Sequence, residues 1–214
     1  MKKNNNISII TIIIFIVAVG AFIYSGNKGK KDTAIAVEKA VAVDEHGHSL
    51  PTNTKVSPLT DLIGKPAPDF SLADRDGKLY SLSELRGKNI ILFFNEGLMC
   101  YPACWNQIAS FAKDKRFNDA GTMVLSVVVD SAEDWQSAIE KMPELAAATV
   151  VFDKGAVVSK QFDMLKSASS MHYGSLPGHT YMIIDKEGIV RHVFDDPNMT
   201  IHNDVLIAEI TKLN

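Results

Sequence analysis

The sequence predicts an α/β domain in which helices flank a mostly parallel central sheet that ends in an antiparallel pair. Two observations lead to this prediction. Expected strands and helices alternate along residues 59–214, an order typical of parallel sheets with crossover helices. The expected strands at 90–94 and 123–129 are apolar at nearly every position, which indicates that both faces of the sheet are buried.

The individual elements follow from local signals. An Asp-Gly pair at 76–77 predicts a tight turn between two strands. A helix is expected over 105–117, and Ser131 followed by Asp134 resembles a capping box that starts another helix. The remaining expected elements are strands at 149–152, 181–184 and 189–194, a short helix at 156–162, and a C-terminal helix at about 201–213.

The length and charge of the chain restrict its class. The chain has 214 residues and a formal net charge of −3, which suits one domain with one core. A charge balance this weak gives no electrostatic reason to expect nucleic acid or an anionic membrane surface as a partner.

The N-terminal part predicts a membrane anchor. Residues 7–24 form an uncharged apolar run with lysines on both sides, so we expect one transmembrane helix after a short segment at 1–6. A signal sequence is the alternative. Residues 25–58 then form a flexible tether to a domain at 59–214. We expect a single-pass protein of the cell membrane with its domain on the extracytoplasmic side, because a chain without stray thiols suits an oxidising compartment.

Two cysteines are the main clue to function. Cys100 and Cys104 are the only cysteines of the chain, and they follow the apolar run at 90–94 and a turn at 95–97. The start of a helix stabilises a thiolate through its unpaired N–H groups and dipole. We therefore expect Cys100 to be an exposed, reactive thiol with a lowered pKa, and Glu96 in the turn to be solvated.

Several short motifs, in this order and spacing, resemble the alkyl hydroperoxide reductase and thiol-specific antioxidant family, the redoxin branch of the thioredoxin fold. They are GKPAPDFSL at 64–72, LSELRGK at 82–88, the strand before Cys100, VVVD at 127–130 and YMIIDKEG at 181–188. The resemblance implies a thioredoxin-like sandwich and a peroxiredoxin-like enzyme without a bound cofactor. Its substrate would be a peroxide or a protein disulfide, and its electron donor a partner protein with a dithiol.

The resemblance also implies roles for three residues. Cys100 is the expected attacking thiolate and Cys104 the resolving partner that closes an internal disulfide. His179 precedes the strand at 181–184, where many relatives of peroxiredoxins carry an arginine, and is expected to stabilise the thiolate or to bind a peroxide oxygen. His172 is the alternative third group. The chain departs from the family at Gly97 and Phe93, where a hydroxyl residue and a proline are usual.

A copper protein is the alternative. The three-residue spacer of the cysteines resembles that of Sco-type copper-assembly proteins, so Cys100, Cys104 and His179 are alternative copper ligands. Residues four apart on a regular helix have Cβ atoms roughly 5–6 Å apart, too far for an unstrained disulfide. That objection disappears if Cys100 lies before the helix, and we therefore favour a membrane-anchored thiol-disulfide oxidoreductase.

Overall fold

The computed structural model describes residues 59–214. The predicted anchor at 7–24 and tether at 25–58 lie outside the described residues. In the part of the chain that is described, no helix is both long and apolar enough to cross a membrane.

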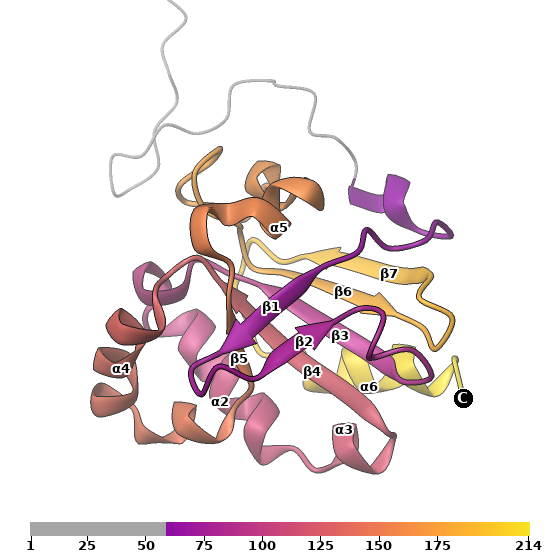
Figure 1. The fold of residues 1–214 in the computed structure, drawn as a ribbon, viewed down its shortest axis with the longest axis horizontal. Helices are drawn as coiled ribbons and strands as arrows, with labels where there is room; N and C mark the ends of the chain where they lie inside the picture. The colour runs from indigo at the N-terminus through magenta and orange to yellow at the C-terminus, as the bar shows by residue number, and fades with distance from the viewer. Residues whose placement is uncertain (1–58) are drawn as a thin grey trace, which may run out of the picture. The chain divides into compact units, whose positions relative to one another are not determined.

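Seven strands form one mixed sheet in the order β2-β1-β5-β4-β3-β6-β7 (Figure 1). Strands β3, β4 and β5 run parallel, while β6 and β7 are antiparallel additions at one edge. At the other edge the antiparallel pair β1–β2 joins through β1 to β5. The strands span Ser71–Asp74 (β1), Leu79–Ser81 (β2), Asn89–Phe94 (β3), Thr122–Val128 (β4), Val150–Phe152 (β5), Thr180–Ile184 (β6) and Val190–Asp195 (β7). The prediction of a mixed sheet with an antiparallel pair at one end is confirmed, but the expectation of a mostly parallel sheet is wrong, because only β3–β4 and β4–β5 pair in parallel.

The helices lie close to their expected positions. They span Ala103–Lys113 (α2), Arg116–Asp119 (α3), Ala132–Lys141 (α4), Val157–Gln161 (α5) and Asn203–Thr211 (α6). The predicted cap of α4 is confirmed, because Ser131 Oγ accepts a hydrogen bond from the Asp134 N–H at 3.0 Å.

One expected helix is divided. The helix predicted over 105–117 ends at Lys113, and α3 follows after a break. Asp114 has an extended backbone, and its Oδ1 accepts the Arg116 N–H at 3.2 Å. A short carboxylate side chain competes in this way with the helical hydrogen bonds.

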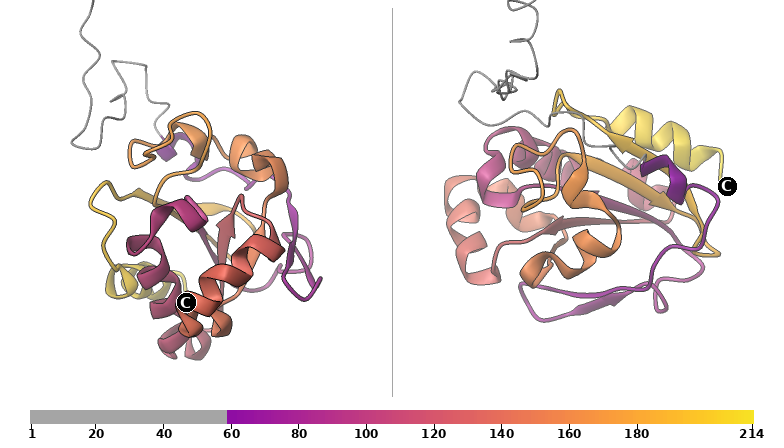
Figure 2. Two further views of the ribbon diagram at one scale, coloured as in Figure 1. Left: turned by 90° about the vertical axis from the view of Figure 1, so that its left-hand side faces the viewer. Right: turned by 90° about the horizontal axis from the view of Figure 1, so that it is seen from above.

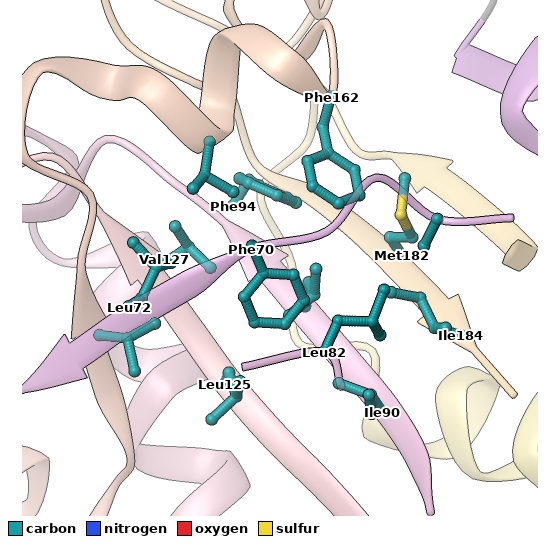
Figure 3. Close-up of a cluster of buried hydrophobic side chains, with 14 of the residues drawn as sticks. Phe70, Leu72, Leu82, Ile90, Phe94, Leu125, Val127, Phe162, Met182 and Ile184 are labelled. Carbon is teal, nitrogen blue, oxygen red and sulfur yellow. The ribbon is translucent and has the colours of Figure 1, made fainter. Parts of the chain in front are cut away.

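Strand β3 supplies both faces of the sheet with core residues. All six of its residues are buried, and successive side chains point to opposite faces. Ile90, Leu92 and Phe94 belong to the hairpin-side core, which also contains Phe70, Leu72, Leu82, Leu125, Val127, Phe162, Met182 and Ile184 (Figure 3). Ile91 and Phe93 belong to the helix-side core, with Cys100, Cys104, Trp105, Ile108, Trp135, Tyr181, Leu206 and Ile210.

Different elements cover the two faces. Figure 2 shows α6 on the opposite side of the sheet from the β1–β2 hairpin and α5. The helix-side core receives side chains from α2, α3, α4 and α6, whereas α5 contributes to the hairpin-side core. Both cysteines therefore lie on the helix-covered face.

Candidate active site

The turn after β3 places the first cysteine. Asn95 closes this turn, since its Oδ1 accepts the Gly97 N–H at 3.0 Å and its Nδ2 donates to the Phe93 carbonyl at 3.2 Å. Gly97 has φ +57°, and a Cβ there would lie 1.7 Å from Asp130 Oδ2. A side chain at this position would displace the Asp130 carboxylate. Asp130 instead accepts the Leu98 N–H at 3.1 Å and fixes the start of the 3-10 helix η2, Gly97–Cys100.

Cys100 and Cys104 are joined by a disulfide with a Cα–Cα distance of 5.4 Å, within the usual range for such bonds. Cys100 ends η2, and Cys104 lies in the first turn of α2 after Tyr101 and the helix-capping residue Pro102. The two residues therefore do not share one regular helix. This confirms the expectation that Cys100 lies before the helix and removes the geometric objection to a disulfide.

The predicted exposure of Cys100 is wrong. Its exposed fraction is 2%, and that of Cys104 is 0%. The reason lies in η2, which points Cys100 into the helix-side core against Met199, whose Sδ is 3.9 Å from Cys100 Sγ. The neighbouring Met99 and Tyr101 side chains are exposed instead. They form the surface of the molecule beside the disulfide.

His179 lies beside the disulfide, next to the second cysteine. Its Nδ1 is 3.3 Å from Cys104 Sγ, and its ring is fully buried just before β6. Burial lowers the pKa of His179 to about 4, although Asp196 acts against this shift. The imidazole is therefore neutral at pH 7, so it does not replace the positive charge of an arginine.

A chain of buried polar side chains continues behind His179. His179 Nε2 is 2.7 Å from the Tyr181 hydroxyl, which donates to Gln107 Oε1 at 3.0 Å. Gln107 Nε2 in turn donates to Asn203 Oδ1 at 2.9 Å. Sequence reasoning missed Tyr181, Gln107 and Asn203. The available signal was a polar Gln107 between apolar residues of α2, but its partners lie 74 and 96 positions away.

Glu96 and His172 form a second buried contact. The expectation of a solvated Glu96 is wrong, because its exposed fraction is 2%. Glu96 Oε1 accepts the His172 N–H at 3.0 Å and the Ser170 hydroxyl at 3.2 Å, and Oε2 is 3.1 Å from His172 Nδ1. The turn before the cysteines thus holds the loop that leads to His179. His172 faces this carboxylate, whereas His179 faces the disulfide.

Trp105 connects the site to the helix-side core. Its Nε1 donates to the Gly97 carbonyl at 3.0 Å. The indole packs edge-on against Tyr101 and Trp135, with ring centroids 4.8 and 6.1 Å apart. It therefore reports on the geometry of the turn that holds Cys100.

The AhpC/TSA family profile matches residues 63–193, more than half of the chain. The chain belongs to the AhpC/TSA family. The match includes β1 to β6, both cysteines and His179.

Relatives within the AhpC/TSA family agree with this assignment. The chain is 31% identical over 152 residues to peroxiredoxin Bcp of Escherichia coli strain K12, covering 67% of this chain and 92% of the relative. It is 30% identical over 139 residues to the chloroplastic peroxiredoxin Q of Triticum aestivum, covering 62% of this chain and 58% of the relative. The chain thus spans less than two thirds of the length of this plant relative.

A solved structure supports the fold. Peroxidoxin BcpB from Mycobacterium tuberculosis superposes with a TM-score of 0.59 at 22% identity, covering 71% of this chain and 97% of that one. At this identity the likeness shows the fold alone. Together with the family match it confirms the predicted thioredoxin-like α/β sandwich.

The copper alternative is not favoured. One ligand atom from each of Cys100, Cys104 and His179 lies within 4.8 Å of the others, so the donor set suits a soft cation once the cysteines are reduced. In this structure, however, the two sulfur atoms are bonded to each other. The relatives described above are peroxiredoxins.

Proposed function

We propose that this domain is a peroxiredoxin-like thiol oxidoreductase that cycles between a Cys100/Cys104 dithiol and a disulfide. The observation that carries the proposal is the bonded cysteine pair, with a Cα–Cα distance of 5.4 Å, in a chain of the AhpC/TSA family. The cycle needs no bound cofactor, because the two sulfur atoms carry both electrons.

The proposed reaction has two oxidative steps. The Cys100 thiolate attacks one oxygen of a peroxide, the O–O bond breaks, and the products are a sulfenic acid on Cys100 and an alcohol or water. The Cys104 thiol then attacks the Cys100 sulfur, and water leaves as the disulfide forms. A partner dithiol reduces the disulfide and is itself oxidised to a disulfide. A protein disulfide can replace the peroxide, with a mixed disulfide as the intermediate and a thiol as the leaving group.

The surroundings of the sulfur atoms support Cys100 as the attacking residue. In the sequence, Cys100 lies between two exposed residues, Met99 and Tyr101. Cys104 instead lies against His179 in the interior. Because only 2% of Cys100 is exposed, a small peroxide reaches its sulfur more easily than a folded protein does. We therefore favour peroxide over a protein disulfide as the oxidant.

Membrane attachment remains part of the proposal on sequence grounds. The apolar run at 7–24 and the absence of other cysteines support an anchored domain on the extracytoplasmic side. Fractionation of cells that express the full chain tests this. Release of the chain by salt or carbonate washing would contradict the anchor.

Trapping experiments test the cycle. Cys104→Ser should accumulate a sulfenic acid on Cys100 after one equivalent of hydrogen peroxide, detected by mass spectrometry after trapping with a 1,3-dione. Cys100→Ser should lose peroxide turnover by several orders of magnitude, since the remaining thiol lies behind Cys100 in the core. Retained turnover in Cys100→Ser would refute the assignment of the attacking residue.

A copper titration separates the alternative. Two results together would favour the copper-binding function over the proposed one. The reduced chain would react with peroxide no faster than a free thiol does, and it would bind one equivalent of Cu(I) that His179→Ala fails to bind. Fast oxidation with closure of the disulfide supports the enzyme.

A further inference from the structure

The buried polar chain behind Cys104 fixes where the protons of His179 lie. Two oxygen atoms beside the Tyr181 hydroxyl, Gln107 Oε1 and the Thr200 carbonyl oxygen, can only accept hydrogen bonds. Gln107 Oε1 accepts the backbone N–H of His202 at 2.8 Å, and a backbone N–H is always a donor. The Thr200 carbonyl is always an acceptor. Both oxygens face the Tyr181 hydroxyl, at 3.0 and 3.2 Å.

The hydrogen bonds of Asn203 independently determine the orientation of the Gln107 amide, from its Nε2 side. Asn203 Nδ2 lies 3.0 Å from Asp114 Oδ2 and 2.9 Å from Ser110 Oγ. The hydrogen bond to Arg116 lowers the pKa of Asp114 to about 2, so at neutral pH this carboxylate only accepts hydrogen bonds. Asn203 therefore turns Nδ2 toward Asp114 and Oδ1 toward Gln107, whose Nε2 must be the donor.

These roles determine the direction of the next hydrogen bond. The single proton of the Tyr181 hydroxyl goes to Gln107 Oε1 or to the Thr200 carbonyl, because otherwise three oxygens would face one another without a proton between them. His179 Nε2, 2.7 Å from the Tyr181 oxygen, must then donate to it. In a neutral imidazole the other nitrogen, Nδ1, carries a lone pair. That nitrogen faces Cys104 Sγ at 3.3 Å.

We propose that Tyr181 and Gln107 hold His179 in the Nε2–H tautomer, so that Nδ1 accepts the proton of the Cys104 thiol when Cys104 attacks oxidised Cys100. The inference rests on the proposed cycle and specifies how its resolving step is catalysed. His179 is the group that contacts the reacting atoms, while Tyr181 and Gln107 are positioning residues.

The step balances with the oxidant already named. The Cys104 proton moves to Nδ1, the Cys104 sulfur attacks the Cys100 sulfur, and the S–O bond of the sulfenic acid breaks. The departing hydroxide takes the proton from Nδ1, which yields the disulfide, water and neutral His179. With a mixed disulfide, the departing thiolate takes the same proton.

The geometry needed for this step does not depend on the disulfide bond. Cys104 is held by α2, and His179 is held between Tyr181 and the backbone contact from Asp196 N–H to its carbonyl at 2.9 Å. Cys100 lies in the short η2 helix. Cleavage of the S–S bond therefore leaves Cys104 beside Nδ1.

The carboxylates of Asp195 and Asp196, near His179, form hydrogen bonds with other residues. Asp196 accepts from the Thr200 N–H at 2.7 Å, and its Oδ2 is 2.7 Å from His202 Nε2. Asp195 accepts from the Thr180 hydroxyl at 2.9 Å and from Ser169. These carboxylates act on His179 at longer range. Tyr181 contacts Nε2 at 2.7 Å, and the Thr200 backbone and His202 also act on the ring.

Histidine NMR tests the tautomer directly. In the full oxidised chain, solubilised in detergent, two-bond ¹H–¹⁵N spectra should show His179 with a protonated Nε2 and an unprotonated Nδ1. His179→Asn identifies the signal by its loss. A His179 signal with a protonated Nδ1 in the wild-type chain would overturn the inference and would leave the Cys100/Cys104 cycle intact.

Kinetics test the role of the tautomer. Tyr181→Phe should slow disulfide closure after peroxide treatment by roughly tenfold or more and leave the rate of Cys100 oxidation unchanged. It should also give a mixture of His179 tautomers. Tyr80→Phe is the matched control, because it removes the hydroxyl of a buried tyrosine that donates to Asp74 at 3.3 Å in the hairpin-side core.

The outcomes separate the two proposals. Closure at the wild-type rate in folded Tyr181→Phe would overturn the inference alone. If that variant does not fold, Gln107→Leu and the wild-type NMR spectrum still decide the question. A wild-type chain in which Cys100 is oxidised but no disulfide closes would overturn both the inference and the proposed cycle.

Discussion

The two cores on either side of the sheet share strand β3 but differ in chemistry. The hairpin-side core is filled by apolar side chains, with one tyrosine at its margin. The helix-side core holds the disulfide and, next to it, the buried side chains of His179, Tyr181 and Gln107. Each of these polar side chains has a hydrogen-bonding partner. The comparison teaches that one face is stabilised by apolar packing, while the other buries hydrogen-bonded polar side chains beside the disulfide.

The largest effect on stability is expected in the hairpin-side core. Leu92 is fully buried there, so Leu92→Ala should lower the free energy of unfolding by about 2 to 5 kcal/mol. The rate of disulfide closure per folded molecule should stay at the wild-type value, because no site residue is touched. Denaturant unfolding and stopped-flow fluorescence check the two halves of this prediction. A large decrease in the closure rate of the folded fraction would contradict the claim that the hairpin-side core affects stability but not the site.

A pH dependence of stability is expected from the helix-side core. Burial lowers the pKa of His179 from 6.5 to about 4 in the folded state. The unfolded chain therefore binds the proton more readily than the folded chain does. The contribution of neutral His179 to the free energy of unfolding is fully present above pH 6.5 and is lost as the pH falls toward 4. The loss amounts to at most about 3 kcal/mol.

Unfolding of the oxidised protein at pH 7 and pH 4 measures this effect, with His179→Asn as the reference that lacks the titrating group. Asp195, Asp196 and His202 also lie near the ring, and all three are present in both proteins. An equal loss of stability in wild type and variant would show that His179 is not held neutral by burial.

The smallest effect is expected at the cap of α4, which packs Trp135 into the helix-side core. Ser131→Ala removes the hydrogen bond to the Asp134 N–H and should cost about 1 kcal/mol of stability. Closure of the disulfide should be unaffected. Thermal unfolding measures the cost, and Ser137→Ala is the control, because it removes a hydroxyl of the same helix that donates to the Asp134 carbonyl but caps no N–H. Equal losses in the two variants would contradict the capping role.

Most of the fold could be predicted from the sequence, because its signals are local. The apolar runs that became β3 and β4, the Asp-Gly turn between β1 and β2, and the Ser131 cap all act through neighbouring residues. The end of α2 at Lys113 was missed, since it depends on the side chain of Asp114 competing with helical hydrogen bonds.

The site could be predicted only in part. The cysteine pair and His179 were identified from the sequence, and the structure brings all three together. The burial of Cys100 and Glu96 was not predicted, because a turn sequence does not reveal what packs over it. The polar chain from Asn203 to His179 joins α2, β6 and α6, and such contacts between distant segments leave no periodic signal.

The central claim is that Cys100 is oxidised first and that Cys104 then closes the disulfide. The most direct measurement is stopped-flow tryptophan fluorescence of the reduced full chain mixed with hydrogen peroxide, since Trp105 adjoins Cys104 and donates to the turn that carries Cys100. Two phases are predicted, of which the first depends on peroxide concentration and the second does not, and Cys104→Ser should lose the second. A single slow phase at the rate of a free thiol, unchanged in Cys104→Ser, would contradict the account.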